Sequence, residues 1–510
     1  MTKSLLRSTS LVSCNTFLSR IMGFVRDIVF AHFFGSMAGF DAFIVAFRIP
    51  NFMRRLFAEG AFSQAFVPVL SQYRETKSPA DAKKFISHMA GVLTFSLVII
   101  TVLGILGSTV ITAIFAPGFL SNGVRFALTS TMLKITFPYL MLISLTALCS
   151  AVLNSYDSFG IPAITPVLLN IVLILMAIFA TPFFPTKVYA LAWGVFIAGF
   201  VQLLFQLPFL YKKELLPLPV ICFKDPGVRR VMKLMVPALF GVSVAQIGIL
   251  IDTSFASFLK VGSVSWLYYS DRLTNFPLGV FGVAIATVIL PKLSRQHSNK
   301  DLQAYSDTMD WSLRLLLLIG IPAGVSIMML AGPLLSTLFF GGKFDVTDVI
   351  MARKSLMAFG VGIQAFMLVK VLTSGFYARQ DIKTPVKIAV VAVLSNIIFN
   401  FIFIVPLAHA GLALATSLAS FINTGLLLYV LLKRKLYIPK QGWLKYFLQL
   451  IIANGAMGVF IYLFSAPLNA WLQHGFFWRV YHLAFLVIVG MILYLLSLFT
   501  VGLRIRHFRI

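Results

Sequence analysis

Charged residues are scarce in this sequence. They make up 11% of the 510 residues, whereas hydrophobic residues make up 59%. Soluble domains carry charge at about a quarter of their positions, so a water-soluble domain is excluded. A bilayer core about 30 Å thick needs roughly 20 apolar residues per helix, and apolar runs of that length recur from one end of the chain to the other. The whole chain is therefore expected to lie in a membrane.

Cysteine and catalytic motifs are also sparse. The three cysteines, Cys14, Cys149 and Cys222, have no paired spacing, which argues against a disulfide framework or a cysteine metal site. We find no HExxH segment, no phosphate-binding loop and no Ser/His/Asp spacing, and the seven histidines are scattered. An enzyme is the least supported class of function, and no organic cofactor is expected.

Acidic residues are few as well. The chain has 16 Asp and Glu against 42 Lys and Arg, which gives a formal net charge of +26. Most of the cations lie in alternate loops between apolar runs, as the positive-inside rule describes for multi-pass membrane proteins. This distribution explains the charge without nucleic-acid binding. It predicts that both termini lie in the cytoplasm.

Apolar windows bounded by proline, glycine and charge predict an all-α polytopic membrane protein with about fourteen transmembrane helices. The predicted spans are 9–31, 39–70, 86–115, 126–152, 161–183, 187–211, 233–258, 264–292, 310–333, 348–376, 384–406, 409–433, 443–465 and 480–503.

An internal repeat relates the two halves of the chain. The segment Arg48-Ile-Pro-Asn-Phe52 is echoed by Arg272-Leu-Thr-Asn-Phe276, and Val-Pro68-Val-Leu-Ser71 is echoed by Leu-Pro291-Lys-Leu-Ser294 at a nearly constant offset. We infer two six-helix lobes of parallel orientation, followed by two extra helices; the domains are 1–222, 223–440 and 441–510. Paired bundles of this kind usually enclose a central substrate cavity and rock against each other for alternating access.

Some charges fall inside the predicted spans, where each costs roughly 3 kcal/mol or more unless it faces water, a partner or a substrate. They are Arg20, Arg26, Asp27, Asp41, Arg48, Arg54, Arg55, Glu59, Asp271 and Arg272. Arg20, Arg54 and Arg272 come from three predicted helices at the inner depth of the membrane, where they could converge on one cavity. Because the arginine fork matches phosphate oxygens, this set predicts a binding site for an anionic headgroup.

The same charges allow a second interpretation, in which the arginines pair internally to hold the first lobe together. Arg26 would pair with a nearby aspartate. Either Arg54 or Arg55 would pair with Glu59. Asp27 and Asp41 fit better as residues that orient arginines than as substrate ligands. Snorkelling to the membrane surface is a sufficient explanation for three further cations near span ends. These are Lys134, Arg314 and Lys370.

One acidic residue lies inside the seventh predicted span without an adjacent cation. This residue, Asp252, is costly in lipid when ionised, so it either stays protonated or meets a cation. Asn396 and Asn400 lie one helical turn apart on the eleventh span, and Thr416 lies on the twelfth. Oxygen ligands without cysteine or histidine suit a hard cation such as Na⁺. Three interpretations stay open: a Na⁺ site, a protonatable Asp252 coupled to H⁺, and a hydrogen-bonded network with no ion.

Long sequence motifs resemble one known family. They are Ser19-Arg20-Ile-Met-Gly-Phe-Val-Arg26-Asp27, Asp41-Ala-Phe, Pro50-Asn-Phe-Met-Arg54-Arg55-Leu-Phe-Ala-Glu59-Gly, Ala116-Pro-Gly118, Lys134-Ile-Thr-Phe-Pro-Tyr139, Ser270-Asp271-Arg272 and Gly375-Phe-Tyr-Ala-Arg-Gln-Asp-Ile-Lys-Thr-Pro385. With these motifs the chain resembles, over nearly its whole length, the MurJ/MviN family of the multidrug/oligosaccharidyl-lipid/polysaccharide exporter superfamily.

The resemblance implies a flippase of the bacterial inner membrane. Its substrate would be lipid II, the undecaprenyl-pyrophosphate-linked disaccharide-pentapeptide used for peptidoglycan synthesis, with membrane lipids around the protein and the cell-wall synthesis machinery as a candidate partner. Carried over position by position, the family's cavity residues fall on Ser19, Arg20, Arg26, Asp27, Asp41, Arg54, Arg55, Glu59 and Arg272. The resemblance also implies a sodium site at Asp252, Asn396, Asn400 and Thr416.

The resemblance further implies a lipid-tail groove formed by the last two helices. One position departs from the family, because some relatives carry a carboxylate where this chain has Asn275. At that position this chain therefore has an amide where the family places an acidic partner for Arg272.

Two other transporter classes remain as alternatives. A flippase for another polyprenyl-linked glycan would keep the architecture and change the cargo, but the length of the motif match favours the MurJ/MviN family. A drug/cation antiporter would be expected to surround organic cations with acidic and aromatic residues, whereas this predicted cavity is rich in arginine.

Overall fold

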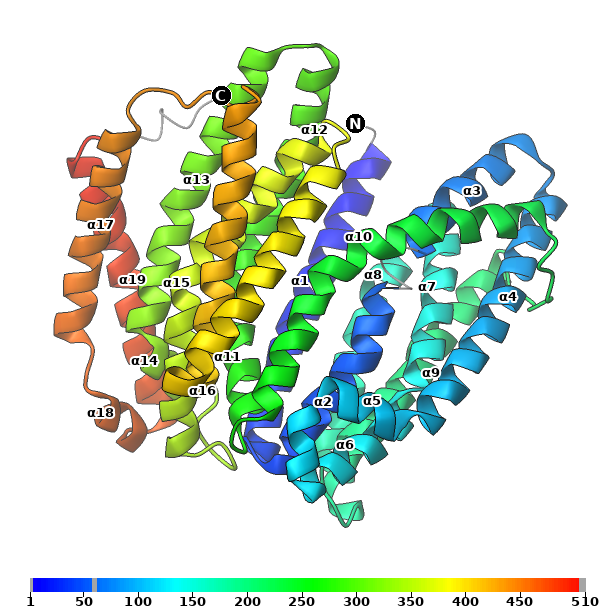
Figure 1. Ribbon diagram of the computed structural model, residues 1–510, viewed down its shortest axis with the longest axis horizontal. Coiled ribbons are helices and arrows are strands. Elements are labelled where there is room, and N and C mark those ends of the chain that lie inside the picture. The colour runs from blue at the N-terminus through cyan, green and yellow to red at the C-terminus, as the bar shows by residue number, and fades with distance from the viewer. Residues whose placement is uncertain (1–2, 57–61, 504–510) are drawn as a thin grey trace. The chain divides into compact units, whose positions relative to one another are not determined.

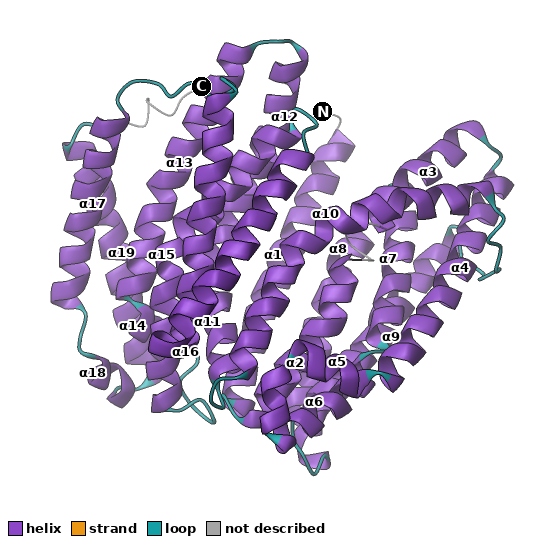
Figure 2. Cartoon of the chain, viewed as in Figure 1, coloured by secondary structure: helices purple, strands orange, loops and turns teal. Residues whose placement is uncertain are grey.

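The computed structural model describes residues 3–56 and 62–503. Each element in this range is a helix, apart from an isolated bridge between Gly341 and Phe344 (Figures 1 and 2). The elements are α1 (Lys3–Phe34), α2 (Ala38–Arg54), α3 (Ser63–Thr76), α4 (Pro79–Leu106), α5 (Ser108–Phe115), η2 (Pro117–Ser121), α6 (Gly123–Thr136), α7 (Tyr139–Ser155), α8 (Gly160–Leu175), η3 (Met176–Ala180), η4 (Thr181–Phe183), α9 (Tyr189–Lys212), α10 (Pro226–Ser257), α11 (Ser263–Pro277), η5 (Leu278–Gly282), α12 (Val283–Ser298), α13 (Leu302–Met329), α14 (Ala331–Leu338), α15 (Val346–Tyr377), α16 (Lys383–Lys433), α17 (Trp443–Phe464), α18 (Leu468–Gln473) and α19 (Phe476–Thr500). The predicted all-α class is confirmed.

Several helices begin where the sequence supplies a capping side chain. The Ser78 hydroxyl accepts a hydrogen bond from the backbone N–H of Asp81 at the start of α4, and the Asp225 carboxylate accepts two from the first turn of α10. Asp345 and Asp348 form a reciprocal capping box at the start of α15. Such caps satisfy the backbone N–H groups that a first helical turn leaves unpaired. They fix helix starts that apolar windows alone leave indefinite.

Within the described residues, ten helical segments are long and apolar enough to cross a membrane. They are Pro79–Leu106, Gly123–Ser155, Gly160–Phe183, Tyr189–Lys212, Ser263–Ser298, Leu302–Met329, Val346–Tyr377, Lys383–Lys433, Trp443–Phe464 and Phe476–Thr500. The predicted spans 9–31, 39–70 and 233–258 fall on α1, α2 with α3, and α10, which lie outside this set. These helices carry most of the charges at membrane depth, and the total of about fourteen spans stays a prediction.

Helix α16 contains two of the predicted spans, 384–406 and 409–433. A straight helix of its 51 residues would be about 76 Å long, far more than the hydrocarbon core of about 30 Å. The backbone is non-helical at Ala408, with φ 48° and ψ −127°. Gly411 lies so close to the chain at Phe403 that a Cβ there would stand 2.2 Å from the Phe403 carbonyl oxygen. The chain therefore folds back here, as the gap between the two predicted spans indicates.

The helices form two compact units, Met1–Val264 and Ser265–Ile510. In the first unit, α1 packs on α8, and α10 packs on α2, α3, α4 and α5. In the second, α15 packs on α13 and α16, while the C-terminal pair, α17 and α19, packs on α13 and α14. Because α10 contacts the helices that precede it, this division falls after α10, whereas the sequence repeat places the boundary at 222/223. The predicted lobe boundaries stay a prediction.

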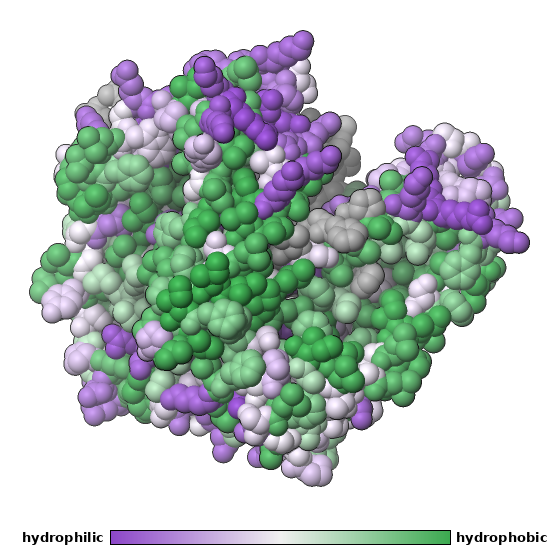
Figure 3. Space-filling model, viewed as in Figure 1, coloured by the Kyte–Doolittle hydropathy of each residue, from purple (hydrophilic) through white to green (hydrophobic). Residues whose placement is uncertain are grey.

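Aromatic side chains are prominent in both hydrophobic cores. Phe62, Phe66 and Phe85 stack in sequence in the first unit, with ring centroids 5.1 and 5.5 Å apart. In the second unit, the fully buried Trp471 belongs to the cluster that joins the C-terminal pair to α13 and α14. On the face shown in Figure 3, hydrophobic residues cover the middle of this unit's helices and hydrophilic ones gather toward their ends. This is the distribution that a bilayer imposes on its embedded helices.

Candidate functional site

The first group of predicted site residues lies on α1. Arg26 and Asp27 are buried, with 7% and 0% of their surface exposed. The Arg26 guanidinium donates to the Asp27 carboxylate from Nη2 at 2.7 Å and from Nε at 3.0 Å, and to the side-chain oxygen of Asn170 on α8 at 3.1 Å. A buried guanidinium requires such partners to offset its desolvation. This pair fastens α1 to α8, and a direct role for it in substrate binding stays a prediction.

Ser19 and Arg20 lie nearly two turns earlier on the same helix. Asn170 donates from its Nδ2 to the backbone carbonyl of Ser19 at 3.3 Å, so this carbonyl belongs to the same α1–α8 contact. Arg20 is exposed, and within the described part of the chain its guanidinium takes part in no hydrogen bond or ion pair. A cation in a membrane helix needs water or a ligand when the protein supplies no partner. The Arg20 guanidinium is therefore available to a ligand.

Asp41 and Arg48 connect α2 to α10 and to the turn that follows it. Asp41 is fully buried, and its Oδ2 accepts a hydrogen bond from the backbone N–H of Gly262 at 2.7 Å. Gly262 has a φ of 94°, a left-handed conformation that glycine adopts without steric cost. About two turns further along α2, Arg48 Nη1 donates to the Thr253 hydroxyl of α10 at 2.5 Å. Asp41 thus fixes a tight turn in the backbone, and its role as a substrate ligand is untested.

The remaining predicted residues of α2 reach different partners. Arg54 is partly buried, and its Nε donates to the side chain of Asn51, one turn earlier, at 3.0 Å. Arg55 is exposed, and its Nη1 donates to the Gln246 side chain of α10 at 3.2 Å. Glu59 lies outside the described residues, so its predicted pairing with either arginine stays a prediction. The segment of α2 and Arg55 therefore contacts α10 at two residues, Thr253 and Gln246.

Arg272 lies on α11 in the second unit. One turn later, the Asn275 side chain donates to the backbone carbonyl of Asp271 at 2.9 Å and to its carboxylate at 2.8 Å. The amide at this position thus binds the aspartate that precedes Arg272. Because Arg20 and Arg54 belong to the first unit, the convergence of the three arginines on one cavity stays a prediction.

Three of the four residues predicted to hold a sodium ion lie together on α16. Asn400 Nδ2 donates to Asn396 Oδ1 at 3.1 Å, and Asn396 Nδ2 donates to the Thr416 hydroxyl at 3.3 Å. Both asparagines are buried. Neutral oxygens of this kind fit a hard cation in chemical type. The fourth residue, Asp252, lies on α10 in the first unit, so its contribution to the set stays a prediction.

Sequence reasoning missed a buried carboxylate on α13. Asp310 is 2% exposed and its Oδ1 accepts hydrogen bonds from the Tyr437 hydroxyl at 2.8 Å, the Trp443 indole at 2.9 Å and the Lys440 backbone at 3.2 Å. Its Oδ2 accepts a charged hydrogen bond from Arg314 Nε at 2.7 Å. Together these donors fasten the segment between α16 and α17 to α13.

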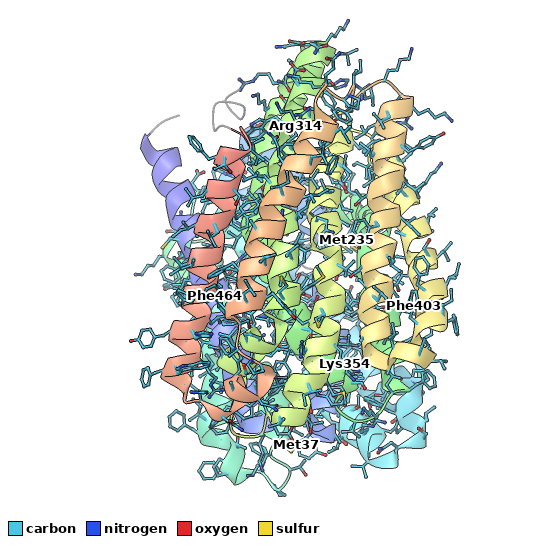
Figure 4. The ribbon with its side chains drawn as sticks, turned by 90° about the vertical axis from the view of Figure 1, so that its left-hand side faces the viewer. Met37, Met235, Arg314, Lys354, Phe403 and Phe464 are labelled. Atoms are coloured by element: carbon cyan, nitrogen blue, oxygen red, sulfur yellow. The ribbon has the colours of Figure 1, made fainter. Side chains whose placement is uncertain are left out.

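The prediction that Arg314 is a single snorkelling charge is wrong. Besides its pairing with Asp310, its guanidinium lies 4.8 Å from the ring centroid of Trp443, and its backbone carbonyl accepts a hydrogen bond from the Tyr446 hydroxyl at 2.5 Å. Figure 4 shows Arg314 near the upper end of the view and Lys354 of α15 in the lower half. The local signal was an aspartate four residues before an arginine, the spacing of a helical ion pair. The distant aromatic partners give no such signal.

The family model of the lipid II flippase MurJ matches residues 30–500. This chain belongs to the MurJ family. The probable MurJ flippase of Haemophilus influenzae is 45% identical over 505 residues, which cover 96% of this chain and 99% of the relative. The MurJ flippase of Burkholderia cenocepacia is 42% identical over 519 residues, which cover 99% of each chain. MurJ membership confirms the resemblance seen in the motifs and the prediction of a transporter rather than an enzyme.

A solved structure of the lipid II flippase MurJ in an inward closed conformation matches the fold. It has a TM-score of 0.81 at 28% sequence identity and covers 96% of this chain and 97% of its own. An inward-facing multidrug resistance MATE family transporter of the MOP superfamily has a TM-score of 0.67 at 12% identity, with coverage of 85% and 98%. The MATE likeness shows a shared fold alone. The MurJ match confirms the predicted helical membrane-transporter architecture, and the chain is an integral membrane protein.

Proposed function

We propose that this chain flips lipid II, the undecaprenyl-pyrophosphate-linked disaccharide-pentapeptide, from the cytoplasmic to the periplasmic leaflet of the bacterial inner membrane. The observation that carries the proposal is membership of the MurJ family along nearly the whole chain. Relatives that match this chain almost end to end are named as lipid II flippases. Flipping a lipid requires only that its headgroup be sheltered from the hydrocarbon core, so a transporter with no catalytic motif is sufficient.

The headgroup would be bound through its pyrophosphate. Arg20 has an unpaired guanidinium within the described part of the chain, while Arg54 and Arg272 complete the predicted set on α2 and α11. Planar guanidinium groups match phosphate oxygens, and their hydrogen bonds strengthen where water is excluded. The prenyl tail would stay in lipid while the two repeated bundles rock and open the cavity first to one side and then to the other.

The hydrogen-bonded charged residues of the first unit would act as positioning residues. Arg26 and Asp27 fasten α1 to α8, which holds the helix that presents Arg20. Asp41 and Arg48 fasten α2 to α10 and the turn after it, which holds the helix that presents Arg54. Substrate contacts are therefore expected from Arg20 and Arg54, with their neighbours acting through them.

Orientation in the inner membrane follows from loop charge. The loop between α9 and α10, with the ends of the helices beside it, carries Lys212, Lys213, Lys224, Arg229 and Arg230, a cluster expected on the cytoplasmic side. The alternation of such clusters along the chain supports two cytoplasmic termini. The cell-wall synthesis machinery, which would use the flipped lipid, is the candidate protein partner.

A sodium ion is the proposed coupling ion. Asn396, Asn400 and Thr416 supply buried neutral oxygens on α16, and Asp252 would supply the negative charge. The test is the melting temperature of the purified protein in NaCl and in an equal concentration of choline chloride. Sodium-specific stabilisation that disappears in Asn400→Leu supports the site. Equal melting temperatures in both salts, with export that depends on the proton gradient, would transfer the coupling role to a protonatable Asp252.

Depletion of the protein from its own cells tests the flippase proposal. Lipid II should then accumulate in the cytoplasmic leaflet, where a membrane-impermeant reagent added outside cannot reach it. Accumulation in the outer leaflet, or no accumulation at all, would overturn the proposal. Accumulation of a different polyprenyl-linked glycan would favour the alternative flippase.

A further inference from the structure

A cavity in the first unit lies apart from the charged residues of α1 and α2. It lies among α4, α7, α10 and Phe62, the residue before α3, and its volume is about 150 Å³. Met89, Leu93 and Ser96 of α4, Ser144 of α7, and Met232 and Met235 of α10 contribute to its lining. Apolar cavities of about this volume bind small apolar groups such as a benzene ring, so part of a hydrocarbon chain fits.

The chemistry of the lining selects an apolar occupant. Of the described residues that line the cavity, none is charged, and its surface is almost entirely apolar. A pyrophosphate, a sugar or a peptide would lose its hydration there without gaining partners, so the headgroup of lipid II does not fit. Three methionines adjust readily to the shape of a ligand because their side chains are unbranched and flexible.

One polar group in the lining is unsatisfied. Ser144 is 2% exposed, and within the described part of the chain its hydroxyl has no hydrogen-bond partner. The other serine of the cavity, Ser96, donates to the backbone carbonyl of Val92 at 2.9 Å. Buried hydroxyl groups are normally paired, so the Ser144 hydroxyl is available to one hydrogen-bonding group of a ligand.

The surroundings of the cavity indicate where such a ligand comes from. Neighbouring residues of α4, namely Phe95, Val98 and Ile99, are 44%, 43% and 45% exposed. They belong to a segment long and apolar enough to cross the membrane, so this part of α4 faces lipid chains. The cavity is therefore close to a reservoir of hydrocarbon chains.

We propose that this cavity binds the hydrocarbon chain of a membrane amphiphile, with a hydroxyl or carbonyl group of the ligand at the Ser144 hydroxyl. The site is separate from the arginines proposed for the pyrophosphate and goes beyond the flipping of lipid II. A chain seated there contacts α4 and α10 at once, and it sets the distance between these two helices.

Photolabelling of the full-length protein in nanodiscs tests the proposal. The probe is a ten-carbon alcohol with a diazirine on its chain, and a phosphatidylcholine with a diazirine on one acyl chain is used in parallel. Mass spectrometry should place the label on residues of the cavity, such as Met89 and Met235, and unlabelled decanol should compete. Labelling by both probes identifies the occupant as an acyl chain, and labelling by the alcohol alone identifies a free amphiphile.

Three variants make the result specific. Ser144→Ala should reduce labelling by the alcohol about threefold to tenfold, the effect of one lost hydrogen bond, and Ser96→Phe should block the cavity. Ser155→Ala is the matched control, because this serine lies on the same helix and already donates to the Ala151 carbonyl at 2.8 Å. Label spread along the lipid-facing side of α4 without competition, or labelling unchanged in Ser144→Ala, would overturn the proposal.

Discussion

Two aspartates, one in each unit, accept a hydrogen bond from an arginine at 2.7 Å, but their surroundings differ. Asp27 is completely buried beside a side chain of Arg26 that is 9% exposed, and the pair lies between two helices. The side chain of Asp310 is 3% exposed and that of Arg314 is 21% exposed, and the pair also holds the segment between α16 and α17 through Tyr437 and Trp443. The first pair fastens one helix to another inside the unit, whereas the second anchors a connection at the end of the bundle.

The comparison shows how charge is used in this membrane protein. Where a carboxylate lies within reach, the arginine is fully engaged and stabilises the packing of helices. Arg20 lies on the same helix as Arg26, but it is exposed and has no partner within the described residues. An arginine that pairs with a protein carboxylate should contribute to stability. An arginine that has no protein partner should contribute to ligand binding.

The largest expected effect on stability is at Arg26. Arg26→Ala would remove the Arg26 cation from the buried Asp27 carboxylate, which should lower the free energy of unfolding by about 3–5 kcal/mol. The matched variant Arg20→Ala, on the same helix, should change it by less than about 0.5 kcal/mol because no protein partner is lost. Thermal unfolding of both purified variants in one detergent checks the difference. Equal losses of unfolding free energy in the two variants would contradict the distinction between a structural Arg26 and a ligand-binding Arg20.

The second pair should be weaker because it is more accessible to water. Asp310→Ala removes the acceptor of Tyr437, Trp443 and Arg314, and we expect a loss of about 2–3 kcal/mol. Asp307→Ala on the same helix is the control, because its ion pair with Lys440 spans 3.2 Å between side chains that are 36% and 51% exposed. Such exposed pairs contribute less than about 1 kcal/mol. A similar loss in both variants would contradict the anchoring role of Asp310.

The asparagine network of α16 should have a smaller effect. Asn400→Leu removes the hydrogen bond to Asn396 and adds apolar volume, for which we expect a loss of about 1–2 kcal/mol in the absence of sodium. Ser395→Ala is the control, because its hydroxyl donates to its own helix at Val391 and lies outside the network. Unfolding followed in sodium-free buffer checks the prediction. A loss below that of Ser395→Ala would show that the network does not stabilise α16.

The smallest effect is expected at a surface pair that joins Asp381, in the turn before α16, to Arg434, the residue after α16. Partial burial tends to raise the pKa of Asp381, but hydrogen bonds from Thr384 and Arg434 outweigh it, so the pKa lies below its ordinary value. The pair should contribute less than about 1 kcal/mol, since Arg434 is 48% exposed. A lowered pKa means that this contribution is present above about pH 4 and is lost as the pH falls through the folded-state value.

Asp381→Asn removes that titration. Its stability should therefore differ from that of the unmodified protein at neutral pH and converge with it in acid, which unfolding curves at several pH values will show. A difference that grows on acidification would contradict the assigned sign.

Much of the fold could be predicted from the sequence because it depends on residues that are close together along the chain. The break of α16 near Ala408 follows from two apolar spans separated by a short gap, and the Arg26–Asp27 pair follows from neighbouring charges on one helix. The hydrogen bonds of Asp310 could not be predicted from the sequence, because Tyr437 and Trp443 are more than a hundred residues away along the chain. The cavity at Ser144 was invisible for the same reason, since helices far apart in sequence line it.

The candidate site was predictable in its residue types and less so in their roles. The cost of charge in a membrane identified Arg20 and Arg26 equally, because sequence alone does not show which one meets a carboxylate. The structure separates them through the geometry of α1 on α8.

The leaflet distribution of lipid II in cells that carry Arg20→Ala, expressed at the level of the unmodified protein, tests most directly whether the open arginine serves the ligand. If Arg20 binds the pyrophosphate, lipid II will accumulate in the cytoplasmic leaflet although the variant folds with normal stability. A leaflet distribution identical to that of the unmodified protein would contradict this role.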